Sequence, residues 1–68
     1  MMTRKDYVST AEILNDAIAF AEENSPENSQ ALFHSIETIQ FVAEQFAELF
    51  ANDNKNFDED IFFKAVHA

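Results

Sequence analysis

Few side chains in this sequence combine the type and the spacing that a catalytic or metal centre requires. His34 and Glu37 are three residues apart, so on a helix an imidazole and a carboxylate could reach one metal ion. Metal centres inside helical bundles use Glu-x-x-His pairs from two helices together with further inward glutamates. Here the order is reversed and the pair falls on a polar helix face. We therefore interpret His34 as a surface histidine and expect no metal.

The segment from Asn52 to Phe63 has part of the spacing of a calcium-binding loop. Oxygen-bearing side chains fall at its first, third, fifth, seventh and ninth positions. A calcium loop also needs glycine at its sixth position and glutamate at its twelfth, where this chain has Phe57 and Phe63. A reading that starts at Asp53 places Lys55 at the third position. We therefore expect no calcium site.

Covalent catalysis and phosphate binding lack their usual residues in this chain. It has no cysteine, and the absence of glycine excludes glycine-dependent phosphate loops and the dinucleotide fingerprint. Each serine has a plain capping or surface explanation: Ser9, Ser25, Ser29 and Ser35. We expect a chain of 68 residues to be too small to enclose a pocket of about 300 Å³ by itself. The sequence therefore predicts a protein that is not an enzyme and has no cofactor.

Charge is the strongest feature of the composition. Thirteen acids and four bases give a net charge of −9, and no lysine or arginine lies between Asp6 and Asn54. Nucleic-acid binding needs basic side chains that replace phosphate counterions, so we expect no direct binding to DNA or RNA. Anionic membrane surfaces are disfavoured for the same reason, and no apolar run approaches the roughly 20 residues of a membrane span. We expect a cytoplasmic protein, and a basic protein partner is permitted.

The first expected helix covers about residues 4–24. Thr3 and Asp6 have capping-box spacing. A start at Ser9, with Glu12 as its partner, is the alternative. The early start is favoured because it brings Tyr7 into an apolar stripe of helical period. The stripe consists of Tyr7, Ala11, Leu14, Ile18 and Ala21.

The second expected helix covers about residues 26–52, with Ser25 as its cap and Pro26 at its first position. Its apolar residues repeat at seven-residue intervals, which is the clearest periodic signal in the chain. They are Leu32, Ile36, Ile39, Ala43, Phe46 and Phe50. A link of one or two residues predicts an antiparallel hairpin with this stripe in its seam.

A short third helix is expected over about residues 59–67. Asp58 is its predicted cap, and Phe57 and Phe62 have the spacing of a hydrophobic staple. We expect this helix to turn back along the last turns of the second helix. Its predicted contacts there are Val42, Phe46 and Leu49. The sequence thus predicts an all-α protein with one domain, residues 1–68.

Several large apolar residues lie off the predicted seam. Two long helices and one short helix cannot cover all of them, and exposed apolar patches mark interfaces. The candidate interface residues are Ile13, Phe20, Phe33, Phe41 and Phe63. We predict a homodimer in which two hairpins form a four-helix bundle. The alternative is that the third helix covers Phe41 and the others are scattered surface residues.

Three acids form a candidate acidic face beside Phe41. Glu37, Glu44 and Glu48 fall on one side of the second helix. This face is either a solvated surface or a ridge that meets a basic partner. The sequence predicts a non-enzymatic protein-interaction module, and the alternative is an acidic nucleic-acid mimic that inhibits a DNA-binding or defence protein. A third possibility is an assembly factor that only self-associates.

Both ends of the chain carry a family resemblance. The opening from Thr3 to Tyr7, TRKDY, and the ending from Asp53 to Ala65, DNxxFDxxxFxxA, resemble short uncharacterised proteins of bacteriophages and prophages. The resemblance covers about a third of the chain. The usual ending has basic residues after the asparagine and after the aspartate, whereas this chain has Lys55-Asn56 and Glu59-Asp60. The resemblance implies a phage accessory protein in the host cytoplasm, without an activity or site residues.

Overall fold

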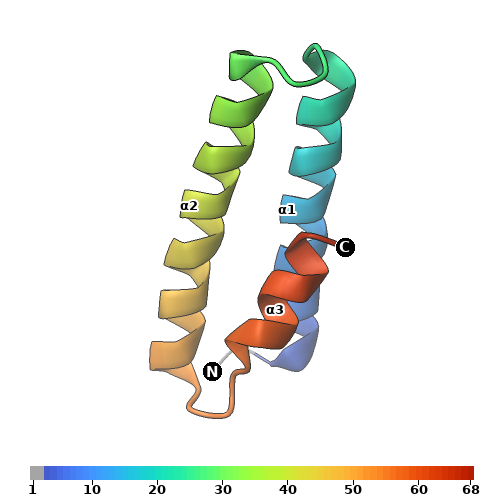
Figure 1. Cartoon of the computed structure of the whole chain (residues 1–68). Helices are drawn as coiled ribbons and strands as arrows, with labels where there is room; N and C mark the ends of the chain where they lie inside the picture. The colour runs from blue at the N-terminus through green and yellow to red at the C-terminus, as the bar shows by residue number, and fades with distance from the viewer. Residues whose placement is uncertain (1–2) are drawn as a thin grey trace.

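The chain folds into three helices in a computed structural model, of which residues 3–68 are described. The helices are α1 (Arg4–Asn24), α2 (Gln30–Asp53) and α3 (Glu59–Val66). Figure 1 shows α1 and α2 as an antiparallel hairpin, with α3 folded back against it. The molecule measures 39 × 17 × 15 Å. The predicted all-α hairpin with a short third helix is therefore confirmed.

The first helix begins at the earlier of its two predicted starts. The backbone N–H of Thr3 donates to the carboxylate of Asp6 over 2.8 Å, and the Thr3 hydroxyl donates to the same oxygen over 3.2 Å. These bonds satisfy a donor at the helix end that would otherwise lack a partner. Because the helix starts here, Tyr7 falls on the buried stripe and is only 9% exposed.

The predicted start of the second helix at Pro26 is wrong by four residues. α2 begins at Gln30, and its cap is Ser29, whose hydroxyl accepts the N–H of Leu32 over 3.1 Å. Asn28 has φ 58°, a left-handed conformation that cannot continue into a helix. The connection therefore spans residues 25–29, with Ser25 and Pro26 in the loop instead of at the helix start.

The core is an aromatic cluster at the end of the hairpin where the α2–α3 loop lies. The ring of Phe50 is 1% exposed, and its centroid is 4.8 Å from that of Tyr7 and 5.6 Å from that of Phe62. Phe57, in the loop before α3, stands edge-on to Tyr7 at 4.8 Å. Tilted and edge-to-face arrangements of this kind are the favourable ones for aromatic rings. The cluster therefore joins all three helices.

Burial along the hairpin seam is uneven. Ala11, Ala43 and Ala47 are at most 3% exposed, and their small side chains let the helices approach closely. At the opposite end, Leu32 and Ile36 of the predicted seam are only half-buried. The difference arises because α3 has eight residues and covers only one part of the hairpin.

The placement of α3 differs in part from the prediction. The three predicted contacts of α3 on α2 do not all hold. Val42 and Leu49 are 37% and 52% exposed, and Phe46 is half-buried and packs against Phe50 of its own helix. α3 instead packs its apolar side, Phe62 and Val66, against both α1 and α2. The physical reason is that α3 buries more apolar surface when it packs against both α1 and α2 than when it packs along α2 alone.

Polar contacts fix the end of α3. The side-chain amide of Asn15 donates to the carbonyl oxygens of Val66 and Ala68, each over 2.9 Å. Beside them, His67 Nε2 lies 2.6 Å from Gln40 Oε1. These contacts connect residues 66–68 to α1 and α2, and the Asn15 amide satisfies carbonyl groups that the end of a helix leaves without partners.

Truncation of Phe50 tests the aromatic cluster. We expect Phe50→Ala to lower the free energy of unfolding by about 3–5 kcal/mol, because it removes a buried ring and leaves a cavity. Phe41→Ala is the matched control. Because Phe41 is 60% exposed, this substitution should change the free energy of unfolding by no more than about 0.5 kcal/mol. Urea unfolding followed by circular dichroism measures both. If Phe50→Ala and Phe41→Ala lowered the free energy of unfolding equally, the assignment of Phe50 to the core would be wrong.

Removal of the Asn15 amide tests the attachment of α3. We expect Asn15→Ala to cost about 1 kcal/mol, because its hydrogen bonds to the carbonyls of Val66, the last residue of α3, and of Ala68 just beyond it are lost, and water replaces them only in part. Asn24→Ala is the control, since the Asn24 amide donates to Phe20 within the same helix. Amide hydrogen exchange should accelerate in α3 for Asn15→Ala alone. Unchanged α3 protection would show that these bonds do not hold the helix.

Candidate interaction surfaces

One broad side of the hairpin has no helix packed on it. α3 reaches α1 through Asn15 and α2 through Gln40. Each residue advances about 100° around a helix. The flank of α1 opposite Asn15 and the flank of α2 opposite Gln40 therefore point away from α3. We call this surface the α3-free face. It consists of Thr10, Ile13, Ala17, Phe20 and Asn24 from α1 with Ser35, Ile39, Val42, Phe46 and Leu49 from α2.

Large apolar side chains of the α3-free face are open to solvent. Ile13 and Phe20 are each 67% exposed, and Leu49 is 52% exposed. Ile39 and Phe46 lie half-buried between them. A shallow groove of about 570 Å³ runs along the turn end of this face, with Phe20 from α1 and Ile39 from α2 in its lining.

The α3-free face repeats every seven residues. Ile13 and Phe20 are seven apart, as are Ile39 and Phe46, and Ser35, Val42 and Leu49 continue the series. This is the period of the seam between α1 and α2 and of helices in bundles. The sequence analysis placed Ile13 and Phe20 among the candidate interface residues, but it assigned Val42, Phe46 and Leu49 to contacts with the third helix. Their seven-residue spacing was the signal that could have placed them here.

The same face carries almost no charge. Asp6 and Asp53, both near the end of the hairpin where α2 leads into α3, are the only acids on the corresponding flanks of α1 and α2, and His34 lines the groove at the turn end. The remaining acids of both helices fall on the other flanks. In a chain with thirteen acids and a net charge of −9, this distribution separates an uncharged apolar surface from an acidic remainder.

The other predicted interface residues lie apart from the α3-free face. Phe33 and Phe41 are 63% and 60% exposed and occupy other flanks of α2. Phe63 is half-buried and stacks edge-on against Phe62 at 5.6 Å. The structure therefore brings Ile13 and Phe20 onto one surface and leaves the three phenylalanines elsewhere.

The predicted acidic face lies on the exposed side of α2. Glu37, Glu44 and Glu48 are all exposed, and Gln40 Nε2 donates to Glu44 over 3.4 Å. Glu44 and Glu48 share a surface groove with Phe63 of α3. This acidic ridge is thus next to α3 and on the opposite flank of α2 from the α3-free face.

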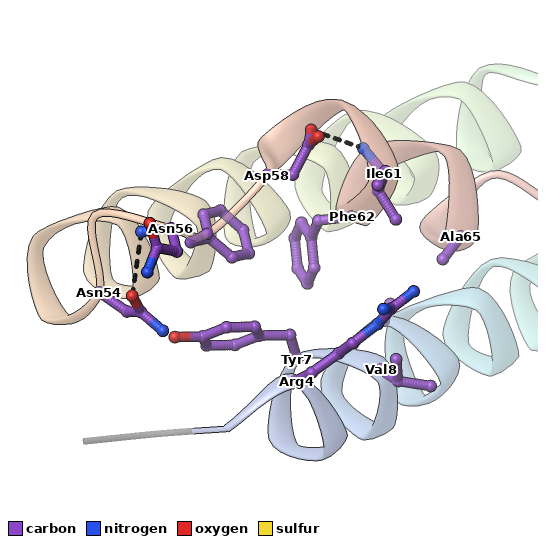
Figure 2. A pocket seen from close by; sticks show the side chains of 11 residues that line it. Arg4, Tyr7, Val8, Asn54, Asn56, Asp58, Ile61, Phe62 and Ala65 are labelled. Carbon is purple, nitrogen blue, oxygen red and sulfur yellow. Dashed lines mark hydrogen bonds between the residues drawn. The ribbon is translucent and has the colours of Figure 1, made fainter.

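A third surface is a cleft between α1 and α3, which sequence reasoning missed. Its volume is about 430 Å³, and it is an open cleft, unlike the enclosed pocket that we expected a chain of this length to be too small to form. Figure 2 shows Tyr7 and Phe62 at its base, with Val8 and Ile61 on its two sides. The small side chains of Ala11 and Ala65 also line it. Two alanines on facing helices leave the gap, and periodicity alone does not reveal such a gap.

The described part of the chain has neither a cluster of metal ligands nor a helix that could span a membrane. Within residues 3–68, no three histidine, cysteine, aspartate or glutamate side chains converge as metal ligands would. None of the helices in that range combines the length and apolar character needed to cross a membrane. Comparison of the chain with protein families, curated proteins and solved structures finds no match.

Proposed function

We propose that this protein is a non-enzymatic interaction module that forms a homodimer through its α3-free face. The observation that supports the proposal is the contrast between an uncharged apolar face and a strongly acidic remainder. Burial of an unpaired carboxylate at an interface is costly, and the α3-free face avoids that cost over most of its length. Its exposed side chains, such as Ile13, Phe20 and Leu49, gain from removal from water.

A second copy fits the shape and the charge of this face. Two chains with a net charge of −9 each repel one another overall, so they can associate only where carboxylates are few. Two hairpins with the same seven-residue period pack as a four-helix bundle. The whole molecule measures 39 × 17 × 15 Å, so one long side of it is of the same order as the roughly 800 Å² per partner that stable interfaces bury.

The biological setting that we propose is that of a phage or prophage accessory protein in the cytoplasm of the host. The support is the resemblance of the opening TRKDY segment and of the ending DNxxFDxxxFxxA. In such a setting the dimer would act by binding a further protein. The acidic ridge of Glu37, Glu44 and Glu48 is the surface that a basic partner would contact.

A charge placed on the α3-free face tests the dimer. We expect Phe20→Asp to convert the protein to a monomer, because the interface would then bury two unpaired carboxylates. Phe33→Asp is the control, since Phe33 is equally exposed but lies elsewhere. Analytical ultracentrifugation gives the mass, and the melting temperature of the wild type should rise with concentration. A wild-type chain that remains monomeric at millimolar concentration would disprove the proposal.

The second candidate function, an acidic nucleic-acid mimic, is favoured by the exposure of the three ridge acids. If the ridge occupies a basic groove, replacement of Glu37, Glu44 and Glu48 by glutamine should abolish partner capture from host lysate. Added salt from about 50 mM to about 200 mM should weaken capture at least about tenfold. Phe20→Ala is the contrasting variant, since a module that docks through the α3-free face would fail on it and tolerate salt. Quantitative pull-down measures all of these.

A further inference from the structure

The cleft between α1 and α3 lies away from both proposed protein-binding surfaces. We propose that this cleft binds a small amphiphilic carboxylate, a molecule with an unbranched apolar tail and one anionic head. The tail would lie on the aromatic base of the cleft, and the head would meet the guanidinium of Arg4. The proposal is independent of the homodimer, because none of the cleft residues belongs to the α3-free face.

The interior of the cleft is suited to an apolar tail. Tyr7 and Phe62 are at most 9% exposed and form its base, whereas Val8 and Ile61 on its sides are 44% and 57% exposed. A tail between those two side chains would remove them from water without displacing any core residue. The volume of about 430 Å³ falls within the range of about 300–1,000 Å³ that is usual for small-molecule sites.

Arg4 provides the charge selectivity at the mouth of the cleft. It is the only basic residue in the lining, and Figure 2 shows its side chain extending along the opening toward Val8 and Ala65. A guanidinium in this position can hold a carboxylate through two parallel hydrogen bonds. The head of the ligand would therefore stay at the rim while its tail enters.

The one acid in the lining is already engaged. Asp58 Oδ1 accepts the backbone N–H groups of Asp60 and Ile61 over 3.0 and 3.2 Å. It caps α3, and the positive end of that helix dipole partly offsets its charge. The side-chain oxygen of Asn54 is likewise occupied, since it accepts the N–H of Asn56 over 2.9 Å. Arg4 is therefore the charged group that remains directed to a ligand.

Because the protein has a strongly negative net charge, a preference for an anionic ligand would indicate a specific site with its own positive charge. A surface with a net charge of −9 attracts cations and repels anions in general. An amphiphile that bound only by non-specific contact would therefore bind best with an ammonium head. Preference for a carboxylate over an ammonium with the same tail would require a local cation, and Arg4 is the one that the cleft supplies.

Three probes with one tail test the proposal: octanoate, octanol and octylammonium, each below its micelle concentration. We expect octanoate to shift the backbone amide NMR signals of Val8, Ala11, Ile61 and Ala65 in a saturable titration. Its dissociation constant should be about tenfold lower than that of octanol, which corresponds to about 1.4 kcal/mol. Octylammonium should bind the cleft more weakly than either.

Two variants assign the binding to Arg4 and to the cleft. Arg4→Met should raise the dissociation constant of octanoate to that of octanol, whereas Lys5→Met, with the same change in net charge, should leave it unchanged. Ala65→Leu should exclude all three probes, with circular dichroism to confirm the fold. Absence of octanoate binding, a preference for octylammonium, equal effects of the two methionine variants, or shifts confined to Ile13 and Phe20 would each overturn the proposal.

Discussion

All three helices of this protein meet at the ring of Phe50. The Phe50 ring contacts Tyr7 of α1 and Phe62 of α3, and it also contacts Phe57 in the loop between α2 and α3. Eight residues of α3 cannot form a stable helix alone, so α3 depends on this cluster and on the Asn15 amide for its position. The cluster also defines the cleft, because Tyr7, Phe57 and Phe62 line it. Stability and the proposed ligand site thus share the same aromatic groups.

The position of α3 also determines which surfaces remain available. α3 covers one side of the hairpin near the aromatic cluster and leaves the other side with exposed Ile13, Phe20 and Leu49. Carboxylates are absent along most of that side, so a partner packed there would bury few unpaired charges. The acidic side chains lie instead where solvent or a basic partner can reach them. The two kinds of surface are thus separated around the hairpin.

Much of the fold could be predicted from the sequence because periodicity and helix caps are local signals. The seam around Ala43 and Phe50, and the caps at Thr3 and Asp58, follow from residue spacing alone. The start of α2 could not be predicted, because Ser25 and Ser29 are both good caps and only the left-handed backbone of Asn28 decides between them. The cleft was missed because a gap between helices depends on how α3 seats against α1, which is a tertiary property.

The buried alanines of the seam also fix the register of the hairpin. Ala11, Ala43 and Ala47 lie almost without exposure between the helices, where only small side chains fit such close packing. Sliding α2 along α1 by one turn would bring larger residues, such as Phe46 or Leu14, against these points of close approach. The hairpin therefore has one alignment that packs well, and an insertion of a single residue within either helix would misalign every apolar pair beyond it.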